Sequence, residues 1–141
     1  MLKVASLGSG SKGNATLIAT DKATVMVDCG FTLKETLKRL ERLEVSAHDI
    51  DAVLVTHEHQ DHISGVGPLS RKFDIPVWST RGSLLSGKCG KLTQYSIIEG
   101  FEAFQIGDLD ILPISVPHDA REPCQYLFKA SQKRLAILTD L

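Results

Sequence analysis

Metal-ligating side-chain types are concentrated in one short stretch, residues 56–62. His57, His59, Asp61 and His62 fall here, and they include three of the five histidines of the chain. Imidazole nitrogens and carboxylate oxygens are ligands that Zn²⁺, Mn²⁺ and iron accept. His57 and His59 could bind one ion while Asp61 and His62 bind a second. The stretch therefore predicts a metal site, and the alternative is a polar surface loop that merely contains histidine.

Two neighbouring metal ions would make this stretch a hydrolytic site. Ions roughly 3.5–4 Å apart share a bridging hydroxide and stabilise both the attacking and the leaving oxygen of a phosphoryl or acyl transfer. Two further residues are candidate ligands because each follows a predicted strand: His118 comes after Pro117, and Asp140 ends the last strand. The alternatives are a loop histidine and an ordinary strand-end aspartate. His48 follows a helix instead, so we expect it on the surface.

The predicted elements place the histidines at the end of a buried strand, residues 52–56, where α/β sheets tend to carry their sites. Thr32 can cap a helix, with Glu35 three residues later as in a capping box. Leucines then fall on one face of that helix, at Leu33, Leu37, Leu40 and Leu43. A second short helix is predicted over residues 65–73, and residues 80–100 carry no clear pattern. Further strands are predicted over residues 4–7, 15–20, 24–28, 77–79, 103–106, 109–112, 114–116, 125–130 and 134–139. This order indicates an α+β or α/β layered domain.

The glycine-rich loop at residues 8–14 invites a rival interpretation. Gly8, Gly10 and Gly13 formally match a dinucleotide-binding fingerprint, which requires a helix to follow. Residues 14–20 read as a strand that leads into a hairpin instead. The loop is not a phosphate-binding P-loop either, because Asn14 stands where a lysine should follow Gly13. Nucleotide binding through this loop is therefore disfavoured.

The composition describes an ordinary globular domain. The chain has 141 residues, 43% hydrophobic and 23% charged, and a net charge of −1, which argues against non-specific coating of DNA. No apolar run approaches a membrane span, and the N-terminus lacks a secretory signal, so we expect a cytoplasmic protein without membrane contact. Three scattered cysteines, expected as reduced thiols, are Cys29, Cys89 and Cys124. The middle of the chain carries local positive charge that could contact a phosphate backbone. The alternative is an ordinary solvated surface. The residues are Arg71, Lys72, Arg81, Lys88 and Lys91.

The histidine stretch resembles the signature of the metallo-β-lactamase fold, and three more segments match that fold in order. Residues 25–30 look like its early strand ending in Asp-x-Gly, residues 116–119 resemble its third ligand motif, and residues 138–140 resemble its bridging-aspartate motif. The resemblance implies an αββα sandwich. Residues 1–141 would then be one metallo-β-lactamase-like domain that covers the N-terminal half and part of the second half.

The opening loop narrows the resemblance. Together with residues 56–62, residues 6–14 are similar to the YycJ/WalJ-like branch, which is bacterial, cytoplasmic and implicated in 5′-to-3′ DNA exonuclease activity. The resemblance implies a DNA substrate, two divalent ions (Zn, Mn or Fe), and roles for individual residues. His57, His59 and His118 would bind the first ion, and Asp61 and His62 the second, with Asp140 bridging. Asp61 would also orient or deprotonate the water, and Asp28 would fix the histidine loop by hydrogen bonds. Ser11 and Asn14 would lie near the metals and could touch substrate, or could be plain turn residues.

The chain departs from the family pattern after Asp140. The family continues with a glycine, more strands and helices, and a last histidine ligand, whereas this chain stops at Leu141 after an apolar strand. We therefore expect an incomplete domain. Two alternatives to a DNA exonuclease remain: a hydrolase of the same fold acting on RNA, a thioester, a lactam or a small phosphodiester, and a non-catalytic metal-binding fragment.

Overall fold

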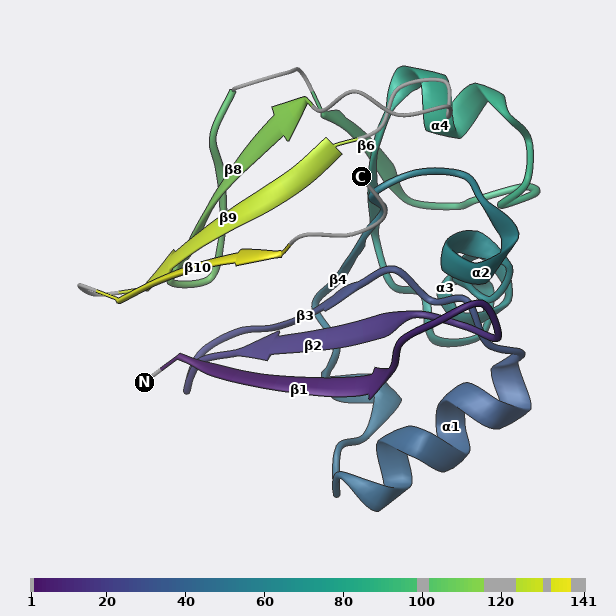
Figure 1. Cartoon of the computed structure of the whole chain (residues 1–141), viewed down its shortest axis with the longest axis horizontal. Helices are drawn as coiled ribbons and strands as arrows, with labels where there is room; N and C mark the ends of the chain where they lie inside the picture. The colour runs from purple at the N-terminus through teal and green to yellow at the C-terminus, as the bar shows by residue number, and fades with distance from the viewer. Residues whose placement is uncertain (1, 99–101, 116–123, 131–132, 138–141) are drawn as a thin grey trace.

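Two β-sheets lie face to face, and helices cover the outer face of the first sheet (Figure 1). The structure is a computed structural model that describes residues 2–98, 102–115, 124–130 and 133–137. The first sheet has six strands in sequence order: β1 (Lys3–Gly8), β2 (Ala15–Ala19), β3 (Thr24–Val27), β4 (Ala52–Leu54), β5 (Val77–Thr80) and β6 (Tyr95–Ile98). The first three are antiparallel, and β3 to β6 are parallel. The carboxyl ends of β3, β4 and β5 therefore meet at one edge.

The second sheet is an antiparallel four-stranded meander in the order β10-β9-β8-β7. Its strands are β7 (Phe104–Ile106), β8 (Leu109–Ser115), β9 (Cys124–Ala130) and β10 (Lys133–Ile137). The expected break between residues 112 and 114 is wrong, because β8 runs on through Pro113 opposite Tyr126. Pro113 lies beyond the last β7 partner, so its missing N–H interrupts no ladder on that side.

The longest helix, α1 (Leu33–Arg42), begins as its capping residue predicts. The Thr32 side chain accepts a hydrogen bond from the Glu35 N–H at 3.1 Å, and Glu35 pairs with Arg39 one turn later at 2.8 Å. Leu40 is buried, but Leu43 caps the helix and is 38% exposed, so the expected apolar face ends one leucine earlier. The remaining helices are short: the 3₁₀ turn η1 (Ala47–Asp49), α2 (Gln60–Ile63), α3 (Val66–Phe73) and α4 (Arg81–Leu85). Among described residues, no helix is long and apolar enough to cross a membrane.

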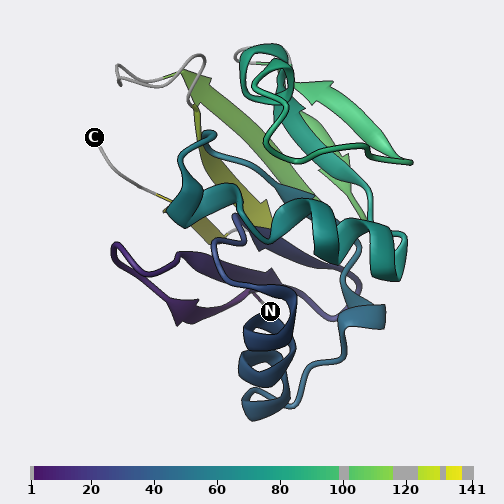
Figure 2. The ribbon, with the colours of Figure 1, turned by 90° about the vertical axis from the view of Figure 1, so that its right-hand side faces the viewer.

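Alternation along the central strands creates two apolar cores. In β3, Met26 faces the helices, while Val25 and Val27 face the second sheet. The helix-side core receives Leu40 from α1 and Leu69 from α3. Figure 2 shows that these two helices lie on the same side of the sheet. The core between the sheets is closed by large side chains of the second sheet, namely Leu109, Ile111, Tyr126 and Phe128. Burial on both faces explains why β4 is apolar throughout and β3 is apolar after Thr24.

Most predicted strands and both predicted helices are confirmed, and α4 and β6 are additions in the region that carried no pattern. Residues 8–14 lead into strand β2, so the helix that a dinucleotide fingerprint requires is absent there. His48 is exposed, as expected, with its ring edge-on to Phe73 at 5.0 Å. All three cysteines are buried thiols.

Candidate metal centre

The histidine stretch begins where β4 leaves the sheet, at the junction between the two sheets. The Val55 N–H donates to the carbonyl of Trp78 in β5, and the Thr56 carbonyl accepts from Cys124 N–H in β9 at 2.9 Å. The hydroxyl of Tyr126 donates to the Val55 carbonyl, and burial raises the pKa of this phenol well above its usual range. Both sheets therefore fix the backbone from which His57 projects.

Asp28, the residue after β3, holds the stretch from the side of the first sheet. Its backbone is left-handed, with φ of 61°, a conformation that aspartate tolerates better than most residues. Its carboxylate accepts three hydrogen bonds: from the Thr56 N–H at 2.7 Å, the Thr56 hydroxyl at 2.6 Å and His62 Nδ1 at 2.6 Å. The predicted role of Asp28 has its physical basis in these three bonds.

The same three bonds define which imidazole nitrogens carry protons. His62 Nδ1 must donate to the Asp28 carboxylate, which leaves the Nε2 lone pair of a neutral ring free of a proton. The Thr56 hydroxyl donates its one hydrogen to Asp28, so its oxygen accepts a hydrogen bond from His57 Nδ1 at 3.0 Å. When neutral, both rings therefore present a basic Nε2, and both Nε2 atoms are buried. A deprotonated Nε2 oriented through Nδ1 is the form in which histidine binds metals.

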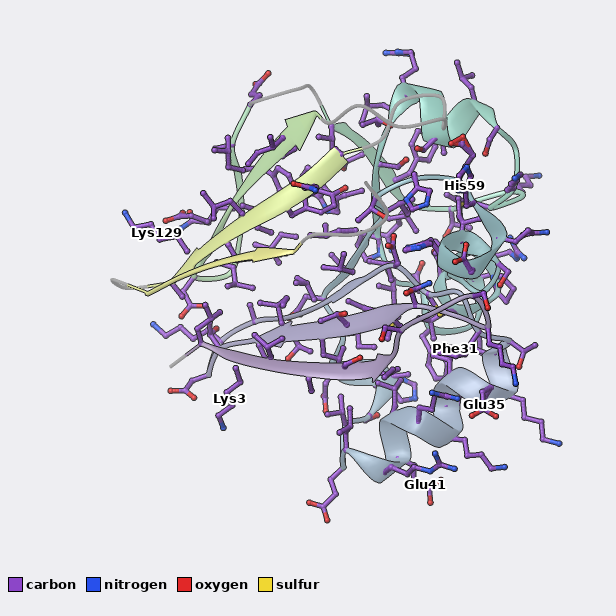
Figure 3. All side chains as sticks on the ribbon, in the orientation of Figure 1. Lys3, Phe31, Glu35, Glu41, His59 and Lys129 are labelled. Atoms are coloured by element: carbon purple, nitrogen blue, oxygen red, sulfur yellow. The ribbon has the colours of Figure 1, made fainter. Side chains whose placement is uncertain are left out.

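The ligand-type side chains lie close together. The ring of His57 is 4.6 Å from that of His59 and 4.2 Å from that of His62, between centroids. Asp61 lies one residue before His62 on α2, and its Oδ2 is 3.7 Å from His62 Nε2. The extended backbone at His59 and the single turn of α2 together bring the four residues near one another. In Figure 3, His59 lies below α4, at the opposite end of the molecule from Lys3 and Lys129.

Three loops are tied together under this cluster. The Asn14 N–H donates to the Asp61 carbonyl at 2.7 Å, the Cys29 N–H to the His62 carbonyl at 2.8 Å, and the Gly65 N–H to the Cys29 carbonyl at 2.7 Å. A Cβ added to Gly30 would lie only 1.8 Å from the Asp61 carbonyl oxygen, so glycine is required for this approach. The positions of Asp61 and His62 therefore depend on residues 14 and 28–30.

The donor set suits divalent transition metals but is incomplete among the residues that the structure describes. Neutral imidazoles with oriented Nδ1–H groups beside a carboxylate are chemically appropriate ligands. Within residues 2–98, 102–115, 124–130 and 133–137, however, no group of three or more such side chains converges closely enough to hold an ion. The other two expected ligands, His118 and Asp140, lie outside the described residues. The described cluster would therefore supply only part of the predicted metal site.

The structure gives several other singled-out residues a context. Ser11 is exposed in the glycine loop, while the Asn14 amide bonds to Gly10 and Asp61, and their contact with substrate stays a prediction. Arg71 donates to the Cys89 carbonyl at 2.8 Å and the Lys91 carbonyl at 3.1 Å, so this cation fixes a loop. Sequence reasoning did not single out Thr56 for its hydroxyl or Tyr126 for its bond to Val55. The position of Thr56 directly before the first histidine was the only available signal.

The comparisons with known proteins agree with this geometry. Residues 8–97 match the model of the metallo-beta-lactamase superfamily. Exodeoxyribonuclease YycJ of Bacillus anthracis is 36% identical over 138 residues, which are 95% of this chain and 52% of that protein. Exodeoxyribonuclease WalJ of Streptococcus pneumoniae is 36% identical over 145 residues, covering 98% of this chain and 54% of that protein. The chain thus spans about half the length of these relatives, and the expectation that residues 1–141 form one incomplete domain stays a prediction.

Solved structures show the same fold at low sequence identity. A B3 metallo-beta-lactamase with an active-site glutamic acid superposes with a TM-score of 0.78 at 19% identity, covering 95% of this chain and 57% of that one. The Rm3 metallo-beta-lactamase superposes with a TM-score of 0.80 at 16% identity, covering 94% and 56%. The expected metallo-β-lactamase fold, an α+β sandwich, is confirmed. On the family match, the fold and the arrangement of the histidine stretch, the chain belongs to the metallo-beta-lactamase superfamily.

Proposed function

We propose that this chain belongs to a metal-dependent hydrolase that cleaves phosphodiester bonds in DNA as an exonuclease. The observation that carries the proposal is the paired orientation of His57 and His62 by Asp28 and Thr56, beside the carboxylate of Asp61. The relatives that match nearly the whole chain bear exodeoxyribonuclease names, which supports DNA as the substrate.

Two divalent ions, Zn, Mn or Fe, would be held by residues with distinct roles. His57, His59 and His118 would bind the first ion and Asp61 and His62 the second, with Asp140 between them. When bound, such ions lower the pKa of a water molecule and stabilise charge on the phosphate oxygens. His118 and Asp140 enter by their place in the sequence, as the described residues supply only part of the set.

The protein's own side chains divide the remaining work. Asp28 and Thr56 are buried, so they hold the two imidazoles without contact with bulk water. The Asp61 side chain is 25% exposed, whereas that of His62 is 1% exposed. The Asp61 carboxylate can therefore reach a water molecule, orient it and accept its proton, as a general base must.

A cationic surface segment is consistent with the proposal of a polyanionic substrate. Residues 75–98 contain no aspartate or glutamate, and they contain three cations, Arg81, Lys88 and Lys91. All three are exposed, and Arg81 begins α4 directly after β5, at the sheet edge that carries the histidines. Exposed cations contribute to the binding of a nucleic acid by releasing counterions from its phosphates.

A substrate panel tests the proposal. Full-length protein is incubated with end-labelled duplex DNA in Mn²⁺, with and without chelator, and in parallel with RNA, a thioester and a β-lactam. We expect metal-dependent release of nucleotides from DNA ends. Rapid thioester or lactam hydrolysis with the DNA intact would contradict the DNA assignment, and preferred RNA cleavage would favour the kind of activity that the name of a 34% identical relative, a ribonuclease Z of Methanopyrus kandleri, indicates.

Charge variants test the cationic segment separately. Replacing Arg81, Lys88 and Lys91 together by glutamine should weaken DNA binding and reduce the slope of log affinity against log salt by up to about 3, roughly one per phosphate contact. The control replaces Lys3 and Lys129, which are exposed at the opposite end of the molecule (Figure 3), and should leave the slope unchanged. Equal slopes in both variants would remove this support for a nucleic-acid substrate.

A further inference from the structure

Asn14 lies between the glycine loop and the candidate metal centre, and each of its polar atoms forms a hydrogen bond. Its Nδ2 donates to the Gly10 carbonyl at 2.8 Å, the Asp61 carbonyl at 3.0 Å and the Asp61 carboxylate at 3.2 Å. Its Oδ1 accepts from the Gly10 N–H at 3.0 Å. Its backbone N–H donates to the Asp61 carbonyl at 2.7 Å, and its carbonyl accepts from the Gly30 N–H at 3.0 Å.

We propose that Asn14 is a positioning residue for Asp61, which fixes the direction of the Asp61 carboxylate and thereby the affinity of one of the two metal ions. This inference rests on the proposed function for its metal part. Asn14 has two amide hydrogens and three acceptors around them, so it has no donor left for a substrate. The geometry thus favours a role exerted through Asp61 over direct contact with substrate.

Asp61 needs such a contact because its surroundings constrain it weakly. The side chain is 25% exposed, and a short carboxylate at a surface can occupy several staggered χ1 rotamers. The bond from Asn14 selects a rotamer whose Oδ2 lies 3.7 Å from His62 Nε2. A neutral amide holds the carboxylate without neutralising its charge, which stays available for a cation.

The other end of the contact is firmly anchored. Phe31 packs so closely under the loop that a Cβ on Gly13 would lie 2.4 Å from its ring. The Arg39 guanidinium lies 4.1 Å from the centroid of that ring and donates to the Leu7 carbonyl, just before the loop. Asn14 therefore transmits the rigidity of α1 and β1 to Asp61.

Two variants and one control test the inference in the full-length protein. Asn14→Ala removes the side-chain bonds, whereas Asn14→Asp keeps the shape but places a second carboxylate against the oxygens of Asp61 and Gly10. Lys12→Ala, an exposed residue of the same loop, is the control. The first readout is the carboxyl-carbon NMR signal of Asp61 in chelator-stripped protein. The second is calorimetric titration with Zn²⁺ and with Mn²⁺.

We expect the Asp61 signal to shift in both Asn14 variants and to stay in place in Lys12→Ala. We expect one of two ions to bind about 10- to 100-fold more weakly in Asn14→Ala, while the other ion binds as in wild type. The inference would be overturned if the Asp61 signal did not change in the Asn14 variants. It would also be overturned if Asn14→Ala bound both ions with the affinities of wild type. If wild type binds no ions, the proposed function fails, but the Asp61 signal still decides whether Asn14 positions this residue. If Asn14→Ala does not fold, the isosteric Asn14→Asp supplies both readouts.

Discussion

A single carboxylate, that of Asp28, organises the chemistry of two histidines. It accepts directly from His62 Nδ1, and it orients His57 through the hydroxyl of Thr56. Sequence comparison with the fold's early motif predicted that Asp28 would fix the histidine loop. It could not predict the relay through Thr56, because that relay depends on distances between side chains that follow β3 and β4, which only the assembled sheet supplies.

Asp28→Asn tests this organisation at constant shape. An asparagine tolerates the left-handed backbone of residue 28. Its amide N–H groups, however, would face at least one of the three groups that donate to the Asp28 carboxylate, so a buried hydrogen bond is lost. We expect a loss of about 1–3 kcal/mol in the free energy of unfolding by urea. We also expect roughly 10- to 100-fold weaker metal binding by calorimetry.

Asp21→Asn, in the exposed β2–β3 turn, serves as the control and should change neither quantity. Metal affinity equal to wild type in Asp28→Asn would contradict the relay.

Among the secondary-structure elements, close backbone contacts position the cluster together with the side-chain bonds of Asp28. The segment after β3 packs directly on α2, and Gly30 is the point of closest approach. The sequence predicted β3, β4 and their apolar pattern well because burial on both faces leaves a strong signal. The short helix α4 and the edge strand β6 went unpredicted, because five-residue helices and half-exposed strands carry little periodicity.

Gly30→Ala should displace α2 without changing any of the predicted ligand side chains. The new methyl group would overlap the Asp61 carbonyl, so the 57–62 segment must move, at a cost of about 1–3 kcal/mol in unfolding free energy. Metal affinity should fall with it, as measured by titration. In Gly87→Ala the added Cβ meets nothing within 4 Å, so this variant suffers only backbone strain and should keep its metal affinity. Equal affinities in both variants would show that the contact does not position the site.

The loop fixed by Arg71 contains Cys89, whose buried thiol should make the stability of the fold depend on pH. Burial raises the pKa of the Cys89 thiol from 9.0 to about 11. The folded state therefore retains a proton that the unfolded state releases, and stability falls as pH rises from about 9 to about 11. Cys89→Ala should show a shallower loss of unfolding free energy over this interval in urea titrations. Parallel curves for variant and wild type would mean that Cys89 does not contribute.

At the scale of the whole molecule, the site depends on both sheets. Tyr126 and Cys124 of the second sheet bond to Val55 and Thr56 of the first, immediately before the histidines. The fold class was predictable from the order of four motifs along the chain. The junction was not, because it joins residues about 70 positions apart through a backbone carbonyl.

Tyr126→Phe tests this junction. Losing the hydroxyl leaves the buried Val55 carbonyl without this bond, so we expect a loss of about 1–3 kcal/mol in the free energy of unfolding. The control, Tyr95→Phe, removes a hydroxyl from a residue that is 56% exposed on β6 and should change stability by less than about 0.5 kcal/mol. Equal effects of the two substitutions would argue against the junction.

Direct metal analysis shows whether residues 57–62 hold metal ions. The full-length protein is stripped with chelator, reloaded with Zn²⁺ or Mn²⁺, and its bound metal is counted by atomic spectroscopy. We predict two ions per chain in the wild type, and at most one in the combined variant His57→Ala with Asp61→Ala. A folded double variant that retains the full wild-type metal content would show that the metal ions bind elsewhere.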